Sequence, residues 1–273
     1  MPDGVVLRGL RVEGPQGVLV QGVDLDVLPG RIHVLVGASG SGKTLSARSL
    51  LGMVDARPGV TQATLEVTWG DQTWRPYEGL DLNSRRARAV AERRFRPLRG
   101  SILGYLPQDA RRSLDPLWTV GRQLRAALAL REQPHDDGPA AWLARAGFPQ
   151  PERVEPLYPH ELSGGMAQRA SIALALARGS RFLLADEPTT GLDPTVQEAI
   201  LQELLALRDQ EGVGLLFITH DLRIVPRLAD RLYVMHAGSL VEDLPGDQLD
   251  QLTSQPARAL WQATARIAGG VLG

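Results

Sequence analysis

The sequence has no cysteine, and Lys43 is its only lysine, so the rest of its 30 basic residues are arginines. The lack of cysteine excludes disulfides, thiolate zinc sites and cysteine-held iron–sulfur clusters, and it agrees with a reducing compartment. Apolar runs such as SIALALA (171–177) are far shorter than a membrane span requires. The N-terminal residues MPDGVVLRGL show no secretory signal. We therefore expect any membrane role to depend on a partner.

The chain also lacks net charge. Its 30 basic and 31 acidic residues give a net charge of −1, which provides no overall field for attracting nucleic acid or an anionic membrane. The arginine-rich segment SRRARAVAERRFRPLRG (84–100) is interpreted as a solvated helix face, because Glu92 interrupts it and the chain is neutral overall. We predict no nucleic-acid partner.

Short apolar segments alternate with helical patterns along most of the chain. The run IHVLV (32–36) has no polar alternation, as expected of a central parallel strand that is covered on both faces. Strands that alternate with helices predict an α/β domain with a mostly parallel sheet. A helical block between SILGYLP (101–107) and RFLLAD (181–186) is interpreted as an insertion into that domain.

The segment GASGSGKT (37–44) follows the apolar strand, precedes a helical pattern and fits the spacing G-x-x-x-x-G-K-[ST]. Its glycines allow successive backbone N–H groups to converge on phosphate oxygens. Lys43 reaches the β/γ-phosphates, and Thr44 places a hydroxyl at a magnesium ion. A compact ammonium fits between phosphates where the planar fork of arginine does not. The predicted nucleotide-binding residues of this loop are Gly37, Ser39, Gly40, Ser41, Gly42, Lys43 and Thr44.

Two adjacent acids end the apolar segment RFLLADEP (181–188). Asp186 is predicted to hold magnesium through water, and Glu187 to polarise the attacking water. Adjacent carboxylates at a strand end are sometimes merely exposed, but a phosphate loop in the same chain favours the functional interpretation.

A second anion site is predicted at LSGGMAQR (162–169). Ser163, Gly164 and Gly165 begin a buried helix, and they offer a hydroxyl and unshielded amides at its N-terminus. Taken alone, this segment is also an ordinary helix cap. Two phosphate sites on different surfaces of one chain indicate a nucleotide held between two copies.

These motifs, in this order, resemble the ATP-binding subunits of ABC transporters over nearly the whole chain. GASGSGKT resembles Walker A, LSGGMAQR the signature motif and LLADE (183–187) Walker B. LPQDARRSLDP (106–116) carries Gln108 of the Q-loop. TTGLD (189–193) and FITHD (217–221) then supply the D-loop and H-loop residues, Asp193 and His220.

The resemblance implies roles for these residues. Glu187 is the general base, His220 contacts the γ-phosphate, and Gln108 senses magnesium and the attacking water. Beyond the phosphate loop, the implied nucleotide-binding residues are Ser163, Gly164, Gly165 and Asp193. The implied magnesium ligands are Thr44, Gln108 and Asp186.

The resemblance also implies the organisation of the protein. The fold is a P-loop NTPase (RecA-like) α/β core with a mostly parallel sheet, an N-terminal antiparallel β subdomain and an inserted α-helical subdomain. The ATPase domain spans 1–250, with the helical subdomain at about 109–175, and 251–273 form a short C-terminal extension. Two such subunits, identical or paralogous, bind ATP and Mg²⁺ head-to-tail at the cytoplasmic face of a membrane, together with permease subunits and an extracytoplasmic solute-binding protein.

Three sequence segments make the resemblance more specific: it is to the ATPases of peptide and nickel importers. QDARRSLDP (108–116), YPHELSGGMAQR (158–169) and QPARALWQA (255–263) are similar to phrases of that group, although Gln255 replaces a histidine. The lack of a cysteine cluster favours the nickel/metallophore or dipeptide branch over the oligopeptide branch. The alternative function is a soluble ABC-type ATPase of a multiprotein enzyme assembly, similar to the carbon–phosphorus lyase partner.

One position departs from the family. Transporter ATPases usually stack adenine on an aromatic residue shortly before the turn into Walker A, and this chain has Gly14 near that place. Because base–aromatic stacking contributes about 1–3 kcal/mol, adenine discrimination is expected to be weak. We expect apolar contact from Val18 or its neighbours instead.

Overall fold

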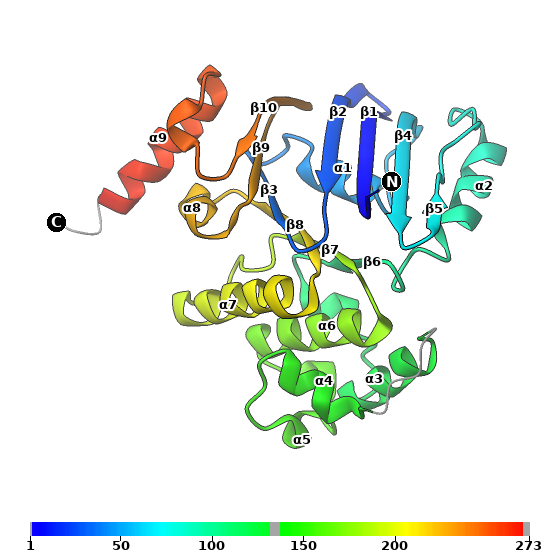
Figure 1. Ribbon diagram of the computed structural model, residues 1–273, viewed down its shortest axis with the longest axis vertical. Helices are drawn as coiled ribbons and strands as arrows, with labels where there is room; N and C mark the ends of the chain where they lie inside the picture. The colour runs from blue at the N-terminus through cyan, green and yellow to red at the C-terminus, as the bar shows by residue number, and fades with distance from the viewer. Residues whose placement is uncertain (1, 132–136, 270–273) are drawn as a thin grey trace. The chain divides into compact units, whose positions relative to one another are not determined.

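A computed structural model describes residues 2–131 and 137–269 of the chain. The chain folds into two compact units: unit 1, formed by Met1–Leu98 and Gly214–Gly273, and unit 2, formed by Arg99–Val213 (Figure 1). None of the helices in the described ranges combines the length and the apolar composition needed to cross a bilayer. The last four residues of the predicted C-terminal extension, 270–273, lie outside the described residues.

Unit 1 begins with an antiparallel sheet, as predicted, whose strand order is β2-β1-β4-β5. Side chains on one face of these strands are buried and those on the other are mostly exposed, which is the alternation typical of an antiparallel sheet with one wet face. A two-residue connection, Gly70-Asp71, joins the last two strands. The bounds are β1 (Gly4–Gly14), β2 (Gly17–Val27), β4 (Gly59–Trp69) and β5 (Gln72–Trp74).

The second sheet of unit 1 places β3 (Ile32–Gly37) between β8 (Gly214–Thr219) and β9 (Arg231–His236), parallel to both. β10 (Ser239–Pro245) pairs antiparallel with β9 at the edge. Every residue of β3 and β8 is buried, which confirms that IHVLV is part of a central parallel strand.

The helices of unit 1 are short apart from two. α2 (Arg85–Phe95) buries Ala87, Ala91 and Phe95 at four-residue spacing, while most of its arginines are exposed. This pattern agrees with the solvated face inferred from the sequence. The other elements are α1 (Lys43–Ser49), η3 (Leu222–Ile224), α8 (Val225–Leu228), η4 (Leu249–Gln251) and α9 (Gln255–Gly269).

Unit 2 contains two parallel strands, β6 (Leu103–Leu106) and β7 (Phe182–Asp186), with helices between them in the chain. α6 (Gly164–Arg178) is buried over most of its length and contacts α3, α4 and α7 (Figure 1). Helices therefore lie where the insertion was expected, and the boundaries 109–175 stay a prediction. The remaining elements are η1 (Ala110–Ser113), α3 (Val120–Ala129), α4 (Pro139–Arg145), α5 (Pro151–Val154), η2 (Pro159–Glu161) and α7 (Pro194–Glu211).

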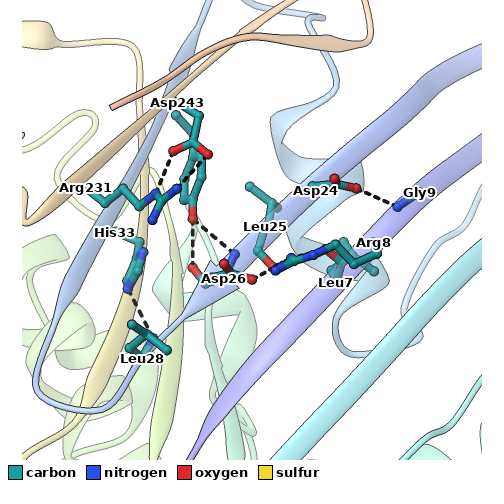
Figure 2. Close-up of polar contacts among 11 residues, drawn as sticks. Leu7, Arg8, Gly9, Asp24, Leu25, Asp26, Leu28, His33, Arg231 and Asp243 are labelled. Carbon is teal, nitrogen blue, oxygen red and sulfur yellow. Dashed lines mark hydrogen bonds and ion pairs between the residues drawn. The ribbon is translucent and has the colours of Figure 1, made fainter. Parts of the chain in front are cut away.

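A polar network joins the two sheets of unit 1 (Figure 2). The Tyr233 hydroxyl on β9 accepts a hydrogen bond from the Asp26 N–H on β2 at 3.1 Å, and the Asp26 carboxylate pairs with Arg8 on β1. Burial raises the pKa of Tyr233 to about 12. Arg231 on β9 forms a two-pronged ion pair with Asp243 on β10, with distances of 2.6 and 2.8 Å. Because β2 and β9 are distant in sequence, the hydrogen bond between Asp26 and Tyr233 fixes a contact that no local segment specifies.

His33 is a second buried titratable residue of this region and is only 2% exposed. Its Nε2 accepts a hydrogen bond from the Leu28 N–H at 3.1 Å, so the ring is neutral there. Burial, reinforced by the nearby Arg231, lowers the pKa of His33 from 6.5 to about 4. Between these values the unfolded chain binds more protons than the folded one, so stability falls as the pH falls.

We predict that His33→Gln flattens this pH dependence. A glutamine amide oxygen can accept the same hydrogen bond without titrating. In the wild type, the free energy of unfolding should fall by about 3 kcal/mol as the pH is lowered from 6.5 to 4 because of this residue. Urea unfolding across that range measures the slope, and the exposed His236→Gln is the control. An unchanged slope in His33→Gln would refute this account.

Candidate functional site

The phosphate loop predicted from the sequence connects β3 to α1 in unit 1. Gly42 caps the start of α1 with φ 101°, a conformation that residues with a Cβ rarely adopt. A Cβ on Gly42 would lie 2.9 Å from Cγ2 of Val20 on β2. Only glycine therefore fits here, and the close approach of β2 holds the loop in place.

Lys43 is held above the loop and is only 5% exposed. Its Nζ donates hydrogen bonds to the carbonyl oxygens of Gly37, at 2.8 Å, and Ala38, at 3.0 Å. Ser39 and Gly40 are exposed, whereas the Ser41 hydroxyl is buried and has no hydrogen-bond partner among the described residues. A buried donor without a partner is costly, and a phosphate oxygen would satisfy it. The loop thus fits a phosphate group.

His220 lies at the same edge of the sheet as this loop. β3 and β8 pair Val36 with Thr219, so Gly37 and His220 follow at neighbouring strand ends. The turn after β8 is fixed by the Asp221 N–H, which donates to Thr219 Oγ1 at 3.0 Å. The His220 side chain is exposed. The structure therefore brings the predicted H-loop histidine beside the predicted phosphate loop.

In unit 2, strand pairing brings together the Q-loop and the two acids. Leu106 on β6 pairs with Ala185 on β7, which places Gln108 just beyond the end of β6 and Asp186 at the neighbouring end of β7. Asp186 is 4% exposed and accepts a hydrogen bond from the Tyr105 hydroxyl at 2.9 Å. Nothing in the sequence singles out Tyr105, because only the register of β6 against β7 reveals this contact.

Glu187 is held in an unusual backbone conformation with φ 49°. Non-glycine residues in this region are strained by about 1–3 kcal/mol and cluster at functional sites. Its Oε2 accepts hydrogen bonds from Gln108 Nε2 at 3.3 Å and Thr190 Oγ1 at 3.0 Å. The predicted base and the Q-loop residue are therefore in contact, and Thr190 is an additional partner that no sequence motif indicates.

The signature segment begins α6 as predicted. The Ser163 hydroxyl caps the helix by accepting the Met166 N–H at 3.2 Å, and both Ser163 and Gly164 are exposed. Gly165 is buried, and a Cβ there would lie 2.5 Å from Cγ1 of Val196 on α7. The first N–H groups of a helix have no partner within it. The start of α6 can therefore offer them to an anion.

The D-loop is braced by the helix that follows it. The Asp193 carboxylate caps α7 by accepting the Val196 N–H at 3.0 Å. Gln197 Nε2 donates to the carbonyls of Thr189 and Leu192, each at 3.0 Å. Asp193 therefore has a structural role, and its contact with nucleotide stays a prediction.

An ion pair joins α6 and α7 in unit 2. Arg169 on α6 and Glu203 on α7 form an ion pair at 2.7 Å, although burial raises the pKa of Glu203 to about 7.

A cavity of about 350 Å³ lies where the Q-loop, the start of α6 and the D-loop meet, and its lining includes Gln108, Gly164 and Thr190. The three loops of unit 2 thus share one surface.

The predicted magnesium ligands fit the chemistry of that ion. Thr44, Gln108 and Asp186 provide hard oxygen donors, which Mg²⁺ prefers. No group of three or more histidine, aspartate or glutamate side chains gathers to hold a metal in the described ranges. Magnesium needs no such cage, because it usually takes one or two carboxylates together with substrate phosphates and water.

Comparisons with known proteins give one consistent result. The family model described as ABC transporter matches residues 20–190. A putative peptide import ATP-binding protein of Brucella abortus (strain 2308) is 38% identical over 239 residues, covering 86% of this chain and 68% of the relative. Dipeptide transport ATP-binding protein DppD of Haemophilus influenzae is 37% identical over 228 residues, covering 82% and 64%.

A solved structure supports the fold. A dimeric ATP-binding cassette in a post-hydrolysis state, bound to ADP and Pi, aligns with a TM-score of 0.67 at 23% identity, covering 88% of this chain and 98% of that chain. At this identity the likeness concerns the fold alone. The predicted α/β P-loop NTPase architecture is confirmed.

We predict that Gly165→Ala destabilises unit 2 through its contact with α7. The added methyl must displace Val196, and overpacking of this kind costs about 1–3 kcal/mol. Thermal unfolding should show a lower midpoint for Gly165→Ala and partial recovery in Gly165→Ala/Val196→Ala. Gly164→Ala, whose Cβ would lie 3.1 Å from Leu192 Cδ2, is the control and should shift the midpoint less. A double variant that is no more stable than Gly165→Ala would argue against the steric cause.

Proposed function

Because the chain belongs to the ATP-binding family of ABC transporters, and is therefore an ATPase, we propose that it powers the import of peptides through a separate membrane permease. The observation that carries the ATPase part is the loop geometry: Lys43 is held against two loop carbonyls, and the buried hydroxyl of Ser41 in the same loop has no hydrogen-bond partner within the described part of the chain. The peptide part is supported by the names of the relatives, which are peptide and dipeptide transport proteins.

In the proposed mechanism, the catalytic groups act mostly by positioning and charge stabilisation. Lys43 and the loop amides bind the phosphates, His220 contacts the γ-phosphate, and Glu187 takes a proton from the attacking water. The hydrogen bond between Gln108 and Glu187 supports coupling of the Q-loop to the base. Magnesium, held by Thr44, Gln108 and Asp186, would neutralise charge that develops on the phosphates.

We further propose that two subunits, identical or paralogous, pair head-to-tail so that Ser163, Gly164 and Gly165 of one meet the ATP of the other. Asp193, at the start of α7, is also exposed. In this arrangement the protein is peripheral at the cytoplasmic face of the membrane, and an extracytoplasmic solute-binding protein delivers the cargo to the permease. The exposed, anion-compatible start of α6 supports this arrangement.

Two alternatives concern the cargo and the assembly. Nickel or a metallophore remains a predicted cargo class, because the sequence segments quoted above resemble those of peptide and nickel importers. The soluble carbon–phosphorus lyase-like assembly is less well supported, because the relatives reported above are named as import and transport proteins. Copurification with a multi-span permease from detergent-solubilised membranes would support the importer, whereas copurification in a soluble enzyme complex would contradict it.

We predict that Lys43→Arg lowers ATP hydrolysis by about 100-fold although the charge is kept. The side chain is enclosed against two loop carbonyls, and losing one preorganised phosphate donor costs on the order of 100-fold in rate. Steady-state phosphate release measures the effect. Arg48→Lys on the same helix is the control and should retain near wild-type hydrolysis. A fully active Lys43→Arg would show that the steric explanation of the lone lysine is wrong.

We predict that Glu187→Gln binds ATP, stays dimeric with ATP bound and hydrolyses it at least about 100-fold more slowly. The amide keeps the hydrogen-bonding shape of the side chain but cannot accept the proton. Equilibrium ATP binding, light scattering and single-turnover hydrolysis separate these effects. Glu211→Gln, at the exposed end of α7, is the control. Unimpaired turnover in Glu187→Gln would exclude Glu187 as the base.

A further inference from the structure

A cavity of about 590 Å³ lies in unit 1, outside every segment described above as a nucleotide-binding motif. Its wall is formed by the segment that follows α1, by the start of β4 and by α2. Small-molecule sites in proteins usually have volumes of about 300–1,000 Å³. The cavity is therefore large enough for a small organic ligand.

Three arginines line this cavity. Arg85 and Arg88 lie three residues apart on α2, a spacing that makes them neighbours on the helix surface, and Arg57 comes from the segment before β4. Arg57 and Arg85 are exposed, and Arg88 is half-buried. None of the three forms an ion pair within residues 2–131 and 137–269. Cations that line one cavity repel one another, and a bound anion would offset that repulsion.

Arg88 is held by the segment that carries Arg57. Its guanidinium donates a hydrogen bond to the carbonyl oxygen of Pro58. A guanidinium has five N–H donors, so other donors are left for a ligand. The turn at Gly59 is compact, because its φ is 91° and a Cβ there would lie 2.8 Å from the Ala56 carbonyl oxygen. The cationic wall is therefore held in place by the backbone around it.

Two acidic residues also line the cavity, and the balance of charge is still positive. Asp55 forms an ion pair with Arg48 at 3.4 Å, and Glu92 lies on α2. The three arginines of the wall thus outnumber the two carboxylates, and Arg48 adds a further positive charge beside Asp55. This balance favours a ligand with more than one negative charge.

Buried aromatic residues of the lining fix α2 against the end of α1. The ring of Phe95 on α2 lies edge-on to that of Tyr77, with the ring centroids 5.1 Å apart. The Tyr77 hydroxyl donates a hydrogen bond to the Ser49 carbonyl oxygen on α1 at 2.7 Å. A Cβ on Gly52 would collide with the Phe95 ring. Because of this close packing, the arginines of α2 stand on a rigid support.

We propose that this cavity is a second anion site, which binds the phosphate groups of a small phosphorylated compound through Arg57, Arg85 and Arg88. Guanidinium groups donate paired hydrogen bonds to phosphate oxygens. A phosphate monoester offers three acceptor oxygens and about two negative charges, so it can serve several arginines at once. A carboxylate has fewer oxygens and a single charge. The inference does not rest on the proposed function, because no residue of the phosphate loop lines the cavity.

Titration calorimetry with inorganic pyrophosphate tests the site, in a Lys43→Ala background that disables the phosphate loop. In this background, Arg57→Gln and Arg85→Gln should each weaken pyrophosphate binding by about tenfold, because each removes charge-assisted hydrogen bonds. Arg86→Gln is the matched control: this arginine is exposed on the same helix but does not line the cavity, so the affinity should not change. Succinate should bind at least about tenfold more weakly than pyrophosphate.

The phosphate groups could be those of a soluble compound or of a lipid headgroup, and vesicles separate the two sources. The protein is sedimented with phosphatidylcholine vesicles that contain phosphatidic acid. Cosedimentation that is lost in Arg85→Gln and kept in Arg86→Gln identifies the headgroup as the source. Cosedimentation that is absent, or equal in the two variants, identifies a soluble compound.

Three results would overturn the proposal. They are unchanged pyrophosphate affinity in both Arg57→Gln and Arg85→Gln, equal weakening in Arg86→Gln, and binding of succinate as tight as that of pyrophosphate. The side chains of Arg57 and Arg85 make no hydrogen bond or ion pair with other described residues, so both variants should fold like their parent. Equal thermal unfolding midpoints check this.

Discussion

The hydrogen bonds of Gly238 hold together the side of unit 1 that carries the phosphate loop. This residue bonds to Ser41 in the phosphate loop and to Gln21 on β2, and so ties the loop to strands of both sheets. The turn permits this because Ala237 and Gly238 both have positive φ, as a two-residue hairpin between right-twisted strands requires. The loop, β2 and the end of β3 are therefore held together.

Unit 2 achieves the same precision with side chains that cap helices and brace loops. Ser163 and Asp193 each close the first turn of a helix, and Gln197 holds the carbonyls of the D-loop. Tyr105 and Thr190 fix the two acids at the end of β7. Capping satisfies backbone donors that would otherwise be exposed or unpaired. Loops that must present polar groups to a ligand can then stay ordered without burying those groups.

Lys43 and two of the arginines show how the two kinds of cation differ in the contacts that they make. Arg231 donates two parallel hydrogen bonds to the two carboxylate oxygens of Asp243, and Arg223 does the same to Asp221. The planar guanidinium suits such exposed carboxylate pairs. Lys43 instead stands in an enclosed place, against loop carbonyls, where a compact charge on a slim stem fits. Lys43 therefore occupies a place where space is limited, whereas Arg231 and Arg223 each contact a carboxylate through two nitrogens.

The sequence by itself determined the phosphate loop, the acids at a strand end, the capped start of α6 and the α/β class. Each of these depends on a short segment whose spacing alone specifies local geometry. The tertiary structure decided what those segments touch. The bond from Tyr105 to Asp186 depends on the register of β6 against β7, and the place of Leu19 depends on a bulge between β1 and β2. Register and bulges arise from pairing between distant segments, so a single sequence does not specify which side chain they turn toward the site.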